Sequence, residues 1–92
     1  MAQFQRARKK AAEICKDLDY TMELSEGGIF DIIAFRQSEI RFIKIMLQEP
    51  SSKEVDDLKA WPSVPQIAKK EFWIISEENG SGKRIKFKKI FL

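Results

Sequence analysis

Apolar residues in the first part of the chain recur at the spacing of an α-helix. They are separated by arginines and lysines, and they comprise Phe4, Ala7, Ala11, Ile14, Cys15 and Leu18. Side chains three and four positions apart lie on the same side of a helix. The pattern therefore predicts an amphipathic helix over about residues 3–18, with its apolar face directed at a core.

The next part of the chain changes to the pattern of strands. A short extended segment at residues 20–24 leads into a Ser-Glu-Gly-Gly turn. Residues 29–35 are β-branched and aromatic, and after a turn at 36–38 the chain returns in a strand over 39–47. From Phe42 onward this strand is apolar on both faces, which predicts a central position in a sheet that is covered on both sides.

A second helix is predicted after Pro50. Ser51 or Ser52 is expected to cap it, since a serine oxygen can accept a hydrogen bond from a free backbone N–H of the first turn. The acidic residues that follow favour the positive end of the helix dipole. The helix is expected to run to about Ala60, because two prolines follow closely and neither fits a helix interior.

Two further strands, at residues 71–76 and 84–92, complete the chain. Between them, Gly80-Ser81-Gly82-Lys83 lacks the upstream glycine and the following Ser or Thr of a P-loop, so a hairpin turn is the favoured interpretation. Trp73 lies in an apolar strand and is expected in the core, while Trp61 is left open between packing and stacking on an unpaired base. The order α-β-β-β-α-β-β predicts one α/β domain, residues 1–92, with a central mixed sheet of about five strands.

Composition narrows the classes of function. The 92 residues include no histidine and one cysteine, Cys15, which excludes histidine-dependent nucleophilic catalysis, an internal disulfide and an ordinary zinc site. No apolar run approaches the roughly 20 residues of a membrane helix. The charged N-terminal segment is also unlike a signal peptide. We therefore expect a cytoplasmic protein without a membrane partner.

Positive charge is concentrated near both ends of a chain whose net charge is +3. The first group is Arg6, Arg8, Lys9 and Lys10, and the second is Lys83, Arg84, Lys86, Lys88 and Lys89. Such groups suit contacts with phosphates, which makes these residues candidates for nucleic-acid binding. The same groups are also typical of solvated chain ends that keep a small protein soluble.

Asp31 and Lys44 are charged residues inside two otherwise apolar strands, where a charge must be paired or functional. Around them, in GGIFDIIAFRQSEIRFIKIM, the chain resembles the PD-(D/E)XK (restriction-endonuclease-like) nuclease superfamily. The resemblance is to the archaeal Holliday junction resolvases and their small phage and bacterial relatives in particular. Those proteins begin with a basic helix that carries a glutamate. They present an aspartate on one strand and, about a dozen residues later, a Glu-x-Lys on the next.

In that family the acids hold magnesium against the scissile phosphate, and the lysine steadies the attacking water or the developing charge. The resemblance implies a restriction-endonuclease-like fold and binding of DNA as a homodimer. Asp31 matches the family's aspartate, but Lys44 stands at the glutamate position, Met46 at the lysine position and Arg8 at the position of the helix glutamate. A second register places Phe42 at the glutamate position and Lys44 at the lysine position.

In both registers the second metal ligand is missing, and a lone carboxylate holds a hard divalent cation too weakly. The resemblance therefore implies a vestigial catalytic site made of Asp31 and Lys44. In this site the lysine ammonium neutralises the aspartate in place of a metal.

Three functions are left open. The leading one is a catalytically inactive DNA-binding domain without a cofactor, with branched DNA among the candidate ligands. The second is an active Mg- or Mn-dependent endonuclease with a rearranged site, in which Asp31 binds the metal with a glutamate from elsewhere, namely Glu13, Glu26 or Glu49. The third is a protein-interaction subunit that does not bind nucleic acid.

Overall fold

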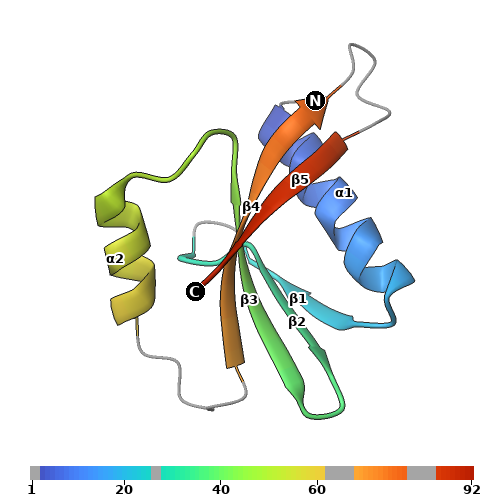
Figure 1. Ribbon diagram of the computed structural model, residues 1–92. Helices are drawn as coiled ribbons and strands as arrows, with labels where there is room; N and C mark the ends of the chain where they lie inside the picture. The colour runs from blue at the N-terminus through green and yellow to red at the C-terminus, as the bar shows by residue number, and fades with distance from the viewer. Residues whose placement is uncertain (1–2, 26–27, 62–67, 79–84) are drawn as a thin grey trace.

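The computed structural model describes residues 3–25, 28–61, 68–78 and 85–92 (Figure 1). The helices are α1 (Gln3–Asp17) and α2 (Ser52–Ala60), and the strands are β1 (Thr21–Leu24), β2 (Ile32–Arg36), β3 (Glu39–Met46), β4 (Ala68–Glu78) and β5 (Ile85–Phe91). This order confirms the one predicted from the sequence. None of the helices in the described part of the chain is long and apolar enough to cross a membrane.

One mixed sheet of five strands forms the centre of the molecule, in the order β1-β2-β3-β4-β5. Neighbouring strands are antiparallel except β3 and β4, which are parallel. A parallel pair needs a crossover connection, and α2 supplies it. Figure 1 shows the result, with α1 on one side of the sheet and α2 on the other. The prediction of an α/β domain with a central mixed sheet is thus confirmed.

The core on the α1 side depends on small helix residues. Ala7, Ala11 and Cys15 are buried and allow the helix backbone to approach the sheet closely. They belong to one cluster with Ile43 of β3 and Trp73 of β4, whose indole is 1% exposed. The prediction that Trp73 lies in the core is confirmed.

The core on the α2 side is aromatic. Leu58 of α2 packs with Phe30 and Phe72, and Trp61 lies against the same cluster. The Trp61 ring meets the Phe30 ring edge-on, with centroids 5.0 Å apart. β3 is therefore packed on both faces, and Trp61 packs within the protein.

Two strands, β2 and β4, begin three residues away from the predicted position. β2 begins later than expected, at Ile32. Just before it, the backbone N–H of Ile45 in β3 donates to the side chain of Asp31, so a side-chain oxygen stands where the strand pair would otherwise use a backbone carbonyl. β4 begins earlier than expected, at Ala68. A charged residue such as Lys70 did not indicate a strand in the sequence. In the structure its ammonium donates to the carbonyls of Leu58 and Lys59 at the end of α2, which holds this part of the strand.

Several sequence predictions fall on positions that are not described. Glu26, Gly27, the segment Gly80-Ser81-Gly82-Lys83 and Arg84 lie outside the described residues. The flanking strands β4 and β5 pair in the antiparallel direction that was expected of them.

Candidate functional site

A pocket of about 370 Å³ opens where β2 begins and β3 ends. We call it the Arg8 pocket, and it is lined by Phe4, Gln5, Arg8, Ser25, Gly28, Asp31 and Lys44. Three residues singled out in the sequence, Arg8, Asp31 and Lys44, thus lie together although they come from α1, the segment before β2, and β3. Met46, which the resemblance places at the position of the family's lysine, is half-buried and packs against the cluster under α2.

Asp31 is fixed in place by its neighbours. Its side chain is 8% exposed, and Oδ2 accepts a hydrogen bond of 2.8 Å from the backbone N–H of Ile45. The ammonium of Lys44 lies 4.0 Å from the same oxygen. Because β2 and β3 are antiparallel, the two side chains face each other across the strand pair. The carboxylate of Asp31 therefore holds the beginning of β2 against β3 and orients the Lys44 side chain.

Arg8 also lines the pocket, and it holds the segment that follows β1. Its Nη2 donates to the carbonyl of Ser25 over 3.2 Å, and the N–H of Ser25 donates to the carbonyl of Asp31 over 3.0 Å. A Cβ at Gly28 would lie 2.6 Å from Ser25 Oγ, so only glycine allows this close approach without a shift. The rim of the Arg8 pocket is thus built by backbone contacts around two charged side chains.

The charges of the Arg8 pocket suit an anion better than a metal ion. Among the lining residues that the structure describes, two cations, Arg8 and Lys44, lie near one carboxylate, which already accepts a backbone hydrogen bond. Among the described residues, no three or more Cys, Asp and Glu side chains gather closely enough to hold a metal ion. A divalent cation placed here would also meet the repulsion of both cations. The described side chains at this pocket do not fit a metal site.

The carboxylates considered as replacement ligands lie elsewhere. Glu49 forms an ion pair with Lys88, with Oε1 and Nζ 2.6 Å apart, and Glu13 is exposed on α1. Neither of them lines the Arg8 pocket. Glu26 is outside the described residues.

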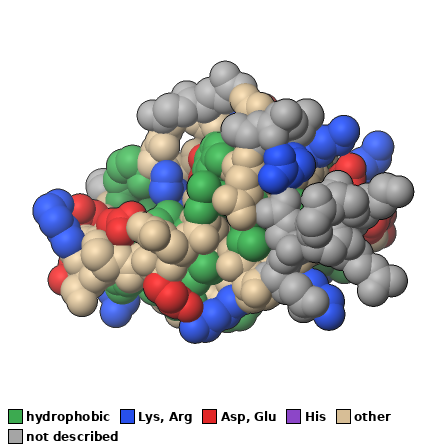
Figure 2. All heavy atoms as spheres, turned by 90° about the horizontal axis from the view of Figure 1, so that it is seen from above, with side chains coloured by type: hydrophobic (Ala, Val, Ile, Leu, Met, Phe, Trp, Pro, Cys, Tyr) green, Lys and Arg blue, Asp and Glu red, His purple; other side chains and the backbone are tan. Residues whose placement is uncertain are grey.

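Basic residues occur on several elements around the molecule. On α1, Lys9 is exposed while Arg6 and Lys10 are half-buried, and on the edge strand β5 Lys86 and Lys88 are exposed. Figure 2 shows the lysines and arginines of the described residues spread over one face, with acidic side chains among them. Lys83 and Arg84 were also predicted as phosphate contacts and are not among the described residues.

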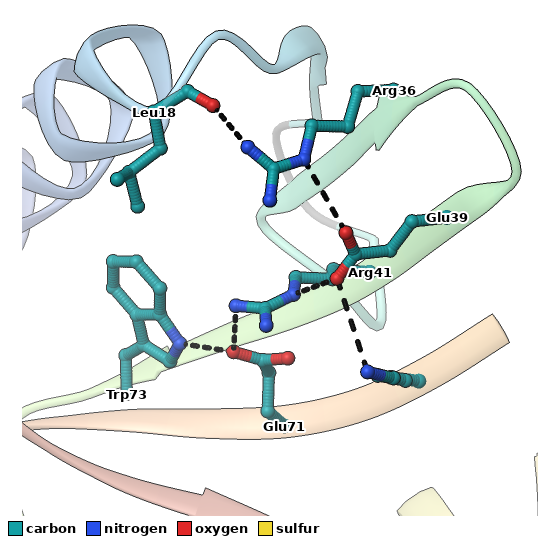
Figure 3. Close-up of polar contacts among 7 residues, drawn as sticks. Leu18, Arg36, Glu39, Arg41, Glu71 and Trp73 are labelled. Carbon is teal, nitrogen blue, oxygen red and sulfur yellow. Dashed lines mark hydrogen bonds and ion pairs between the residues drawn. The ribbon is translucent and has the colours of Figure 1, made fainter.

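A second polar cluster was not found from the sequence (Figure 3). Glu71 is completely buried, and its Oε1 accepts a hydrogen bond of 2.6 Å from Trp73 Nε1 and lies 3.6 Å from Arg41 Nη1. Arg41 also donates to Glu39 over 2.9 Å, and Arg36 donates to the carbonyl of Leu18. We call Arg36, Glu39, Arg41 and Glu71 the Glu71 network.

The Glu71 network joins the end of α1 to the sheet. Arg36 lies over the ring of Tyr20 at 4.4 Å and pairs with Glu39. Burial raises the pKa of Glu39, but hydrogen bonds from Arg41 and Tyr20 and the positive charge of Arg41 outweigh it and hold that pKa below its ordinary value. A charged residue at the start of a predicted strand normally lies in solvent, so the sequence carries no local signal for this network.

A second pocket adjoins the first. It has a volume of about 410 Å³, and we call it the Phe72 pocket; it is lined by Ile29, Lys44, Glu54, Asp57, Leu58 and Phe72. Lys44 lines both pockets, so the two pockets share this side chain. Hydrogen bonds with Ser51 lower the pKa of Glu54, and burial and the charge of Lys44 have smaller effects. Of these lining residues, only Lys44 was singled out in the sequence.

Comparison with known proteins adds no relative. No protein-family model, no curated protein and no solved structure matches this chain. The restriction-endonuclease-like assignment therefore stays a prediction, and the function is argued from the geometry of the site.

Proposed function

We propose that this chain is a DNA-binding domain of the restriction-endonuclease-like type that binds phosphate and does not cleave it. The observation that supports this most is the convergence of Arg8, Lys44 and Asp31 on one pocket. Charge-assisted hydrogen bonds from a guanidinium and an ammonium are among the strongest contacts that a phosphate oxygen receives. Asp31 contributes by positioning Lys44 and holds no metal ion.

The direction of the sequence changes also supports the proposal. The family resemblance expects carboxylates at the positions of Arg8 and Lys44, and both positions carry a cation. Each replacement removes a ligand that magnesium prefers and adds a group that phosphate prefers. The observed element order and the mixed sheet agree with the fold that the resemblance implies.

The basic residues outside the pocket have a different role in this proposal. Lysines on α1 and β5 contact phosphates along the backbone of the ligand, which positions the domain without reading a base sequence. Binding is therefore expected to weaken as salt rises and to depend little on sequence.

Fluorescence anisotropy with a labelled four-way junction and a labelled duplex tests the proposal. We expect both to bind at low salt, and neither to be cleaved when magnesium or manganese is added. Arg8→Gln and Lys44→Gln are each expected to weaken binding by about tenfold, the equivalent of ~1.4 kcal/mol. Lys16→Gln removes the same charge from an exposed position at the end of α1, outside the pocket, and serves as the matched control.

Two results would contradict the proposal. Metal-dependent cleavage that Asp31→Ala abolishes would establish an endonuclease with a rearranged site. Absence of binding to either DNA at low salt would favour a protein-interaction subunit.

A further inference from the structure

The Arg8 pocket and the Phe72 pocket share one lining residue, Lys44. The first carries the charged side chains of Arg8 and Asp31 beside the ring of Phe4. The second has apolar walls formed by Ile29, Leu58 and Phe72. Two neighbouring pockets of such different character suit a ligand with a charged end and a flat apolar end joined by a short link.

The Phe72 pocket has the build of a site for a small ring. Leu58 and Phe72 belong to the core and are 4% and 1% exposed, so two walls are rigid. Ile29 is 49% exposed and forms an accessible wall. Ligand pockets are typically apolar with a few polar groups that fix orientation, and here Glu54 and Asp57 supply those groups.

We propose that the two pockets together bind one unpaired nucleotide of a DNA strand, with its phosphate in the Arg8 pocket and its base in the Phe72 pocket. This inference rests on the proposed function and specifies the ligand of the same site. Lys44 stands between the two parts, where it contacts the phosphate of the nucleotide whose base is bound. A base that is paired and stacked in a duplex cannot enter a pocket, so the nucleotide must be unpaired or displaced from the helix.

The carboxylates at the Phe72 pocket favour one kind of base. A carboxylate accepts hydrogen bonds and donates none when ionised. Glu54 Oε1 accepts the N–H of Ser51 over 3.0 Å, which holds this lining side chain in a defined position. The Watson–Crick edge of guanine presents two N–H donors side by side, and single-stranded bases are commonly recognised at that edge. Guanine is therefore the expected base.

The test compares three labelled duplexes of equal length by fluorescence anisotropy at one salt concentration. The first is fully paired, the second carries one extrahelical guanine, and the third carries an extrahelical abasic nucleotide at the same place. We expect the extrahelical guanine to increase affinity about tenfold over the paired duplex, within the range of base-binding energies. The abasic duplex is expected to bind like the paired one, because it offers the same flexible backbone without a base.

Two variants locate the effect in the Phe72 pocket. Ile29→Trp places a large side chain at the exposed wall and is expected to remove the preference for the extrahelical guanine over the paired duplex. Glu54→Gln keeps a residue that suits the helix cap and is expected to reduce the preference for guanine over thymine. Asp56→Asn makes the same charge change on α2 outside both pockets, and it corrects for the general effect of removing an acid.

The outcomes separate this inference from the function on which it rests. Equal affinity for the paired and extrahelical duplexes would overturn the inference and leave the proposed function standing. The same holds if the preference persists with the abasic nucleotide or in Ile29→Trp. If neither duplex binds, the proposed function is contradicted, and the inference that rests on it is contradicted with it.

Discussion

Asp31 accepts a backbone hydrogen bond in a buried position, and this contact determines what its replacement costs. Asp31→Ala leaves the N–H of Ile45, a residue 2% exposed, without its acceptor. We expect the free energy of unfolding to fall by about 1–3 kcal/mol. Asp31→Asn keeps a side-chain oxygen and is expected to lose less.

Urea denaturation of the two variants beside the parent chain measures this difference. The binding assay gives an independent reading. Asp31→Asn keeps a side-chain oxygen beside Lys44 and removes a negative charge that repels phosphate, so it is expected to bind DNA as well as the parent or more tightly. Equal destabilisation by alanine and asparagine would show that the contact with Ile45 contributes little.

Glu39 is a residue at which pH is expected to act on stability. Its pKa in the folded protein lies below the ordinary value of 4.5, because hydrogen bonds from Arg41 and Tyr20 and the charge of Arg41 outweigh the effect of burial. A carboxyl of this kind stabilises the fold above its unfolded pKa, and the contribution is lost as the pH falls through the folded pKa. We therefore expect the free energy of unfolding to decrease below about pH 4.5.

Denaturation curves across this acid range measure the slope. Glu39→Gln cannot titrate, so its stability is expected to depend less steeply on pH than that of the parent chain. Glu13→Gln, which removes an exposed carboxylate from α1, serves as the control. Parallel slopes for Glu39→Gln and the parent would contradict the role assigned to Glu39.

At the scale of elements, α2 is a short helix whose beginning is held by reciprocal hydrogen bonds. Ser51 Oγ accepts the N–H of Glu54 over 3.1 Å, and Glu54 Oε1 accepts the N–H of Ser51 over 3.0 Å. A helix of nine residues has little stability of its own, so its cap and its packing against the sheet both matter. Ser51→Ala is expected to lower the free energy of unfolding by about 1 kcal/mol.

The neighbouring serine provides the control for this prediction. Ser52 is the first residue of α2 and does not cap it, so Ser52→Ala is expected to change stability little. The sequence alone left the cap open between the two serines. Thermal unfolding of both variants therefore tests the choice that the structure makes, and a larger effect at Ser52 would reverse it.

The helices and strands could be predicted, because apolar residues that face a core recur at the spacing of the element that carries them. The apolar spacing of α1 and the two-sided apolar run of β3 each reflect a core, and both predictions are confirmed. The start of β4 was predicted too late, because the role of Lys70 depends on carbonyls at the end of α2. The residues around one position in the sequence do not show which distant segment will contact it in the fold.

The same limit applies to the candidate site. Asp31 and Lys44 could be recognised from the sequence as charges in apolar strands, and Arg8 from the family resemblance. Glu71 could not, because its burial follows from the parallel register that sets it beside Ile43. The Phe72 pocket likewise forms only when α2 crosses over the sheet, so its walls become neighbours through the topology.

At the scale of the whole molecule, two groups of basic residues on different elements define two candidate surfaces for DNA. Lys9 and Lys10 lie on α1 next to Arg8, whereas Lys86 and Lys88 lie on the edge strand β5. Lys88 forms an ion pair of 2.6 Å with Glu49, and this pair must open before Lys88 can contact a phosphate. We therefore expect α1 to contribute more to binding than β5.

The salt dependence of binding measures this contribution, because the logarithm of the affinity falls linearly with the logarithm of the salt concentration. The slope changes by about 0.9 for each phosphate contact that is lost. The double variant Lys9→Gln/Lys10→Gln is expected to reduce the slope by about 1–2. Lys86→Gln/Lys88→Gln removes the same charge and is expected to change the slope less. The opposite ranking would place the DNA along the β5 edge, away from the Arg8 pocket.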